Sequence, residues 1–256
     1  MDLLWATAVR LKVFRDQPTL EHWHIVIDQE RKTRVDAYRG RMLGESSLWN
    51  TWRMELPAEP NVGALARMEG WARALDPQPR HARHVATLAM ELYDGLCASG
   101  LLSPRLKNGR ETLRTAALMH EIGRSKTKAN CHKASSGLIR KLRVPLGWSA
   151  VDLATAALLV RHHRGRVPSA RPALQRLSPE QRDFVIACAG ILRLADAMDC
   201  GRKEEVHKLT VHNRGAYLEI AALGYHNEGR LAEKIAHARY PLEKFLNRPV
   251  LVRATQ

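Results

Sequence analysis

Apolar side chains recur every three to four residues between about residues 61 and 200, and this spacing limits the middle of the chain to amphipathic helices. Val85, Leu88, Leu92 and Leu96 lie on one face of a helix predicted over 81–98. Glycine, proline and a capping serine mark the ends of the helices that follow. Those helices are predicted to include 113–120 and to span 134–143, 151–163 and 178–196.

The period changes after Gly201, where the sequence predicts a small tail of mixed structure. Strand-like runs at 209–212 and 216–220 flank the turn signal Asn213-Arg214-Gly215. A helix over 229–245 and a strand over 250–252 are predicted to follow. We therefore expect a mainly α fold, a helical bundle with a small C-terminal α+β tail of hairpin, helix and strand.

Two prolines, Pro57 and Pro60, mark a linker near residue 60. The predicted organisation is an N-terminal helical segment of unknown role at 1–60, a helical domain at 61–205 and the α+β extension at 206–256.

The composition is typical of a globular protein from a reducing compartment. The 256 residues are 45% apolar, which excludes a disordered chain. No apolar run approaches the ~20 residues that span a bilayer, and the N-terminus has no secretory pattern. The four cysteines form no C-x-x-C pair, which argues against a zinc ribbon or a disulfide scaffold. We therefore expect a cytoplasmic protein without a membrane partner.

The net charge of +15 is concentrated in one segment. Between Glu121 and Glu180 the sequence holds twelve Lys and Arg residues and a single carboxylate, Asp152. This segregation predicts a surface that meets a polyanion. A solvated basic surface that maintains solubility is the alternative interpretation.

Histidines and carboxylates at the predicted helix ends could bind a metal ion. His81 opens one helix, His120 and Glu121 end another, and Asp196 ends a later one. Imidazole nitrogens and carboxylate oxygens bind divalent transition metals, and a pair of ions can clamp a phosphoryl group. Taken singly, each of these residues is more often part of the core or a helix cap.

Five stretches in order along residues 65–254 carry a family resemblance. They are 76–96 around His81, 117–123 around His120-Glu121, 132–139 beginning His132-Lys133-Ala134-Ser135, 159–165 around His162-His163-Arg164-Gly165, and 192–199 around Asp196. The set resembles the HD-domain superfamily of metal-dependent phosphohydrolases, most closely the C-terminal HD-like region of Ppx/GppA exopolyphosphatases and guanosine pentaphosphate phosphohydrolases. The resemblance implies an HD-domain-like bundle in a phosphohydrolase that acts on polyphosphate or on a phosphorylated nucleotide such as (p)ppGpp.

The resemblance also implies roles for individual residues. It implies metal ligands at His81, His120, Glu121 and Asp196, with His132 as a further candidate. It implies catalytic roles for His120, Glu121 and His163. It implies phosphate binding by Arg124, Lys126, Lys128, Lys133, Arg161 and Arg164. The implied cofactor is a divalent metal such as Mg, Mn, Fe or Co.

Two departures from the family pattern keep a second hypothesis open. The family aspartate is Glu121, and a family histidine is Ala134, which has no metal-binding atom. Both changes favour a degenerate metal site or none. The alternatives to a phosphohydrolase are therefore a non-catalytic module that binds polyphosphate or another polyanion, and a nucleic-acid-binding protein. Convergence of the ligands would favour the hydrolase, and a Glu121 turned to an arginine would favour the binding module.

The resemblance implies two protein partners as well. The related enzymes form dimers, so we expect a homodimer. Their catalytic domain is larger than the 60 N-terminal residues, so we also expect a partner that carries a phosphatase domain.

Overall fold

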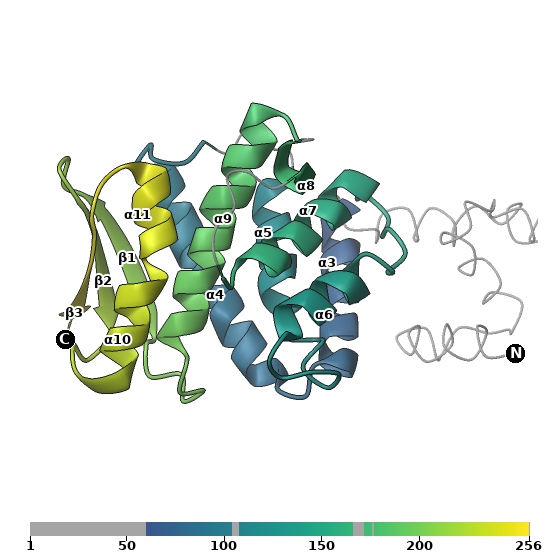
Figure 1. Cartoon of the computed structure of the whole chain (residues 1–256), viewed down its shortest axis with the longest axis horizontal. Helices are drawn as coiled ribbons and strands as arrows, with labels where there is room; N and C mark the ends of the chain where they lie inside the picture. The colour runs from purple at the N-terminus through teal and green to yellow at the C-terminus, as the bar shows by residue number, and fades with distance from the viewer. Residues whose placement is uncertain (1–59, 104–107, 166–171, 176, 256) are drawn as a thin grey trace, which may run out of the picture. The chain divides into compact units, whose positions relative to one another are not determined.

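The computed structural model describes residues 60–103, 108–165, 172–175 and 177–255 (Figure 1). Residues 65–144 and 148–256 form one compact unit, and the account below concerns that unit. The predicted N-terminal segment lies outside the described residues, apart from Pro60.

The unit is mainly helical, as predicted, and α9 lies in its middle (Figure 1). Because α9 packs against α4, α5, α7, α10 and α11, its buried residues form the centre of the core. The helices are α3 (Pro60–Leu75), α4 (Pro79–Ala98), α5 (Gly109–Leu118), α6 (Cys131–Ile139), α7 (Ala150–His162), α8 (Pro172–Gln175), α9 (Pro179–Met198), α10 (Gly229–Ala238) and α11 (Tyr240–Leu246).

The predicted start of α9 at Ser178 is confirmed as a capping box. The Ser178 hydroxyl accepts a hydrogen bond from the backbone N–H of Gln181, and the Gln181 side chain accepts one from the Ser178 backbone. Pro179 follows in the first turn, where its missing N–H costs no hydrogen bond.

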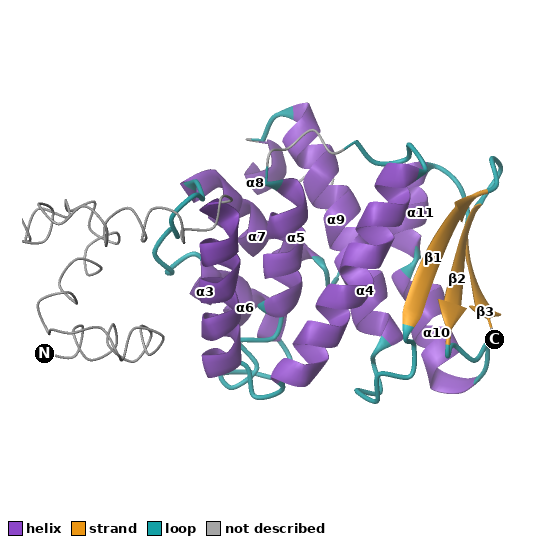
Figure 2. Cartoon of the chain, turned by 180° about the vertical axis from the view of Figure 1, so that it is seen from behind, coloured by secondary structure: helices purple, strands orange, loops and turns teal. Residues whose placement is uncertain are grey.

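The predicted hairpin is confirmed and is part of a three-stranded sheet (Figure 2). Strand β1 (Lys208–Asn213) pairs antiparallel with β2 (Leu218–Leu223), and β2 pairs in parallel with β3 (Val250–Thr255). Gly215 in the connecting turn has a φ of 77°, which suits glycine. The sheet is anchored to the bundle by contacts of β1 with α4.

The prediction of one helix over 229–245 is wrong, because two helices occupy this range. The first helix, α10, ends at Ala238, and α11 begins at Tyr240. The break has a physical cause in Pro241, which lacks an N–H and would clash with the preceding turn if α10 continued.

Two predicted helix boundaries also shift. Helix α6 begins at Cys131 and ends at Ile139, earlier at both ends than the predicted 134–143. Helix α5 ends at Leu118, so His120 and Glu121 lie in the turn after it rather than on its last turn.

The turn after α5 is pressed against α6 at Gly123. The Gly123 N–H donates to the Ser135 hydroxyl over 2.9 Å. A Cβ on Gly123 would lie 2.6 Å from the Ala134 Cβ and closer still to the Ser135 backbone nitrogen. Only glycine allows this approach, which fixes the turn that carries His120 and Glu121.

In the part of the chain that the structure describes, no helix has the length and hydropathy to cross a bilayer.

We expect Gly123→Ala to lower the free energy of unfolding by about 1–3 kcal/mol, because its methyl group overlaps the backbone of α6. The matched control is Gly137→Ala within α6, where an added Cβ has nothing within 4 Å. That change should raise stability by roughly 0.5–1 kcal/mol through helix propensity. Urea denaturation measures both, and equal effects would contradict the proposed close approach.

Candidate functional site

The carboxylate of Asp196 is the point at which three histidines from separate elements meet. His81 lies in the first turn of α4, His120 in the turn after α5, and His163 at the end of α7. The distances from Asp196 Oδ1 to His81 Nε2 and His120 Nε2 are 3.3 and 3.5 Å, and Oδ2 lies 3.9 Å from His163 Nε2. The bundle thus brings together residues separated by more than 110 positions.

Each imidazole is oriented through its other nitrogen. His120 Nδ1 and His163 Nδ1 donate over 2.7 Å to the carbonyl oxygens of Ala117 and Val160. Because a carbonyl only accepts, both Nδ1 atoms carry protons, and each ring directs its Nε2 atom toward Asp196. His81 Nδ1 lies 2.7 Å from Asp199 Oδ2. Among the described residues, the three buried Nε2 atoms have no partner with hydrogen-bond geometry.

The facing nitrogen and oxygen atoms require a proton or a cation between them. Burial lowers the pKa of His81, but its contacts with Asp196 and Asp199 outweigh burial and raise that pKa to about 9. A proton on His81 therefore faces Asp196 when no other cation is bound. Burial lowers the pKa of His163 to about 3, so this imidazole is neutral at pH 7.

Asp196 remains ionised in this environment. Burial would raise the pKa of its carboxyl group, but the contacts with His120 and His81 and the charge of Arg164 hold that pKa well below its usual range.

The separations of His81 Nε2 and His120 Nε2 from Asp196 Oδ1 suit a divalent transition metal. Ligands about 2.1 Å from a tetrahedral ion lie roughly 3.4 Å from one another, close to the separations around Asp196 Oδ1. Oriented imidazoles with free Nε2 atoms are the arrangement that metal sites use. His81, His120 and Glu121 also each have a potential ligand atom, and these three atoms lie within 4.8 Å of one another.

Glu121 is committed to arginines instead. The side chain is fully buried, and its Oε1 accepts from Arg124 Nη1 at 2.9 Å and Arg164 Nη2 at 3.2 Å. Its Oε2 accepts from Arg202 Nη2 at 2.6 Å. Burial would raise the pKa of Glu121, but His120 and Arg202 lower it to about 2. Glu121, which was predicted as a metal ligand, thus contacts arginines. Its side chain points into the protein and not toward solvent.

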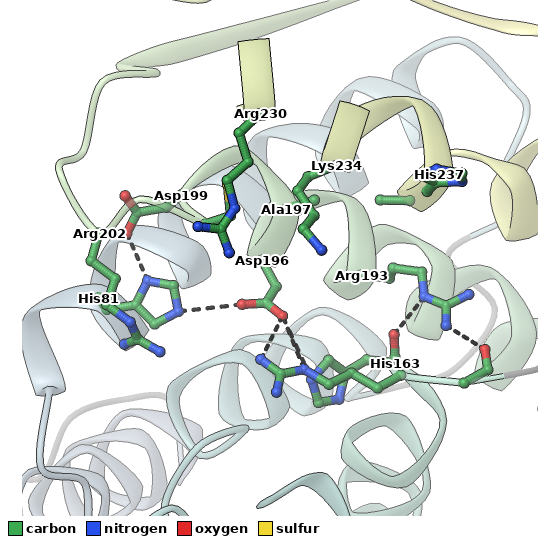
Figure 3. A pocket seen from close by; sticks show the side chains of 14 residues that line it. His81, His163, Arg193, Asp196, Ala197, Asp199, Arg202, Arg230, Lys234 and His237 are labelled. Carbon is green, nitrogen blue, oxygen red and sulfur yellow. Dashed lines mark hydrogen bonds and ion pairs between the residues drawn. The ribbon is translucent and has the colours of Figure 1, made fainter. Parts of the chain in front are cut away.

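A cavity of about 530 Å³ opens onto His81, His163 and Asp196. Figure 3 shows these side chains. Five Arg and Lys residues line it against two carboxylates, so it favours anions. Its charged lining comes from the end of α7, from α9 and the turn after it, and from α10. These charged residues are Arg164, Arg193, Asp196, Asp199, Arg202, Arg230 and Lys234.

The predicted phosphate-binding residues divide into two groups. Arg164 lines the cavity and also contacts Asp196 Oδ2 at 3.0 Å, while Arg124 reaches Glu121. The remaining four are not part of the lining, and three of them are exposed around α6. These four are Lys126, Lys128, Lys133 and Arg161.

His132 lies beside the cluster rather than in it. Its ring centre is 6.3 Å from that of His163, at an interplanar angle of 89°. Burial and the charges of Arg161 and Arg164 lower its pKa.

Sequence reasoning missed four cationic residues of the cavity, Arg193, Arg202, Arg230 and Lys234. Two signals could have indicated some of them. Arg193 precedes Asp196 by three residues, which places both on one face of α9, and Arg230 and Lys234 are four apart on α10. Neither signal shows that α10 packs against α9, which brings these side chains together.

Comparison with known proteins identifies the family. No curated protein matches the chain. A family model described as Ppx/GppA phosphatase, domain III, matches residues 68–231, which is more than half of the chain and includes the histidine cluster, Glu121 and Asp196. The Ppx/GppA part of the predicted resemblance is confirmed, and the relation to the wider HD superfamily stays a prediction. The chain therefore belongs to the Ppx/GppA phosphatase family.

Proposed function

We propose that this chain is a phosphohydrolase that binds the phosphates of a polyanion in the cationic cavity and cleaves a phosphoanhydride at the histidine cluster. The observation that carries the proposal is the position of five Arg and Lys side chains around an opening onto His81, His163 and Asp196. Guanidinium and ammonium groups bind phosphate oxygens, and they offset the charge that develops during phosphoryl transfer.

The cavity residues have separate tasks in this proposal. Arg230 and Lys234 hold phosphate oxygens from the side of α10, and Arg193 is held in place by donating to the His163 carbonyl over 2.8 Å. Neutral His163 offers its Nε2 lone pair as the acceptor that orients a water O–H beside the bound phosphate. Arg164 links Asp196 to the phosphate site.

A divalent metal would be held by His81, His120 and Asp196 Oδ1. When bound, such an ion polarises phosphoryl oxygens and makes water a better nucleophile.

Inorganic polyphosphate is the proposed substrate in preference to a phosphorylated nucleotide. The described lining of the cavity contains no Phe, Tyr or Trp side chain on which a base could stack. The same feature disfavours the nucleic-acid hypothesis. Exposed Lys126, Lys128 and Lys133 would contact the remainder of a long polyphosphate chain.

A second candidate function is binding of polyphosphate without hydrolysis. The contacts of Glu121 with three arginines favour it, because both oxygens of this carboxylate already accept from guanidinium groups. The predicted homodimer and the partner with a phosphatase domain stay predictions.

We expect His120→Ala to lose bound Mn²⁺ and to reduce phosphate release from polyphosphate at least 100-fold, because it removes a donor beside Asp196. Metal analysis and a phosphate-release assay measure the two effects. The control is His212→Ala on β1, which should change neither. Wild-type protein that binds polyphosphate but releases no phosphate with Mn²⁺ would support the binding module instead.

We expect Arg230→Gln and Lys234→Gln each to weaken tripolyphosphate binding about tenfold or more, because each removes a charged hydrogen-bond donor. Calorimetric titration measures the dissociation constant. Lys244→Gln removes an equal charge at an exposed position of α11 and should leave the dissociation constant unchanged. Equal weakening by all three would show that net charge alone, and not the cavity, governs binding.

We expect a triple substitution of Lys126, Lys128 and Lys133 by Gln to weaken binding of long-chain polyphosphate about tenfold but tripolyphosphate less than twofold. The reason is that these exposed residues lie outside the cavity and would reach only a longer chain. The control replaces Lys208, Lys244 and Arg253 by Gln. Equal losses for both chain lengths would contradict the extended path.

A further inference from the structure

Glu121 is not part of the cavity lining, but its carboxylate accepts hydrogen bonds from arginines in different parts of the chain. It is fully buried, whereas the three arginines that contact it are partly exposed, with 29, 35 and 24% of the side chains of Arg124, Arg164 and Arg202 accessible. Arg164 and Arg202 both line the cavity. The buried carboxylate of Glu121 therefore contacts two of the arginines that line the cavity.

Asp196 and Glu121 use their oxygens differently. Asp196 leaves Oδ1 to the imidazoles of His81 and His120 and gives Oδ2 to Arg164. Both oxygens of Glu121 accept from guanidinium groups, at 2.6 to 3.2 Å. A metal ion at Glu121 would share its oxygens with arginines, whereas Asp196 Oδ1 faces only imidazoles.

Arg202 needs such an anchor. It lies in the turn after α9 with a φ of 57°, and Glu204 has a φ of 56°, a conformation that non-glycine residues adopt rarely. The Glu204 N–H donates to Asp199 Oδ1 over 2.9 Å, which closes the turn. The ion pair with Glu121 then sets the direction of the Arg202 side chain.

Arg202 keeps one donor available for a ligand. While Nη2 donates to Glu121, Nη1 is buried and has no partner among the described residues. Buried donors are nearly always paired in the functional state, so this atom indicates a missing acceptor. A phosphate oxygen in the cavity would supply one.

We propose that Glu121 is a positioning residue that directs Arg164 and Arg202 at a bound phosphate, and that it is not a metal ligand. The inference rests on the proposed function, since it assumes that the cavity binds phosphate. This role gives a reason for a glutamate at the position of the family aspartate. The extra methylene lets one carboxylate contact three arginines.

The test compares Glu121→Gln with wild-type protein in two measurements, Mn²⁺ content after dialysis and tripolyphosphate affinity by calorimetry. The substitution makes the cavity wall one charge more positive, so electrostatic attraction alone would tighten binding. We expect binding to weaken about tenfold instead, the effect of losing one charged hydrogen bond, while the Mn²⁺ content stays within twofold of wild type.

The matched control is Glu219→Gln, because Glu219 is also buried and also holds two arginines, Arg214 and Arg253. It lies on β2, away from the cavity, and should change neither measurement. In the Arg202→Gln background, Glu121→Gln should weaken tripolyphosphate binding by less than it does in wild-type protein, because the part of its effect that acts through Arg202 is already lost and only the positioning of Arg164 remains to be removed.

Two results would overturn the inference. Loss of Mn²⁺ from Glu121→Gln, as from His120→Ala, would make Glu121 a ligand. Unchanged or tighter tripolyphosphate binding would exclude positioning. If Glu121→Gln does not fold, Arg202→Gln alone tests the inference. Wild-type affinity for tripolyphosphate in that variant would also exclude the proposed arrangement. Failure of the wild-type protein to bind tripolyphosphate would instead refute the proposed function.

Discussion

The ionised carboxylate of Asp196 in the middle of the bundle is the constraint on which the rest of the site depends. Only 16% of the Asp196 side chain is accessible, and an ionised carboxylate with so little contact with water is costly unless charged or polar groups surround it. Here, His81, His120, His163 and Arg164 lie within 3.9 Å of it, supplied by the start of α4, the turn after α5 and the end of α7. Helix α4 must begin, and α5 and α7 must end, where they do for these side chains to offset the charge of the carboxylate.

The two oxygens of this carboxylate connect two kinds of chemistry. Oδ1 faces the imidazoles of His81 and His120, which suit a metal ion or a proton, and Oδ2 faces the guanidinium of Arg164, which suits an anion. A phosphate held by the cavity arginines would therefore lie beside the site that a metal ion would occupy. This arrangement relates the hydrolase and the binding module, because the second needs only the arginine side of the same carboxylate.

The charge pattern indicated a cationic surface but did not indicate which side chains line the cavity. The run of cations between Glu121 and Glu180 indicated a polyanion surface, yet only Arg164 of the predicted phosphate-binding set lines the cavity. Charge density along a sequence does not specify which way a side chain points. The cavity takes its other four cations from α9, α10 and the turn between α9 and the sheet, where carboxylates offset the basic residues in the sequence.

The sequence by itself determined the helices around the core, the cap at Ser178, the hairpin and the candidates for the histidine cluster, because these depend on local periodicity and short motifs. The tertiary structure decided that Glu121 faces arginines and that α10 forms a wall of the cavity. Arg202 contacts Glu121 across 81 positions, and α10 reaches the cavity only by packing on α9. Such contacts follow from how whole elements pack, which no local pattern specifies.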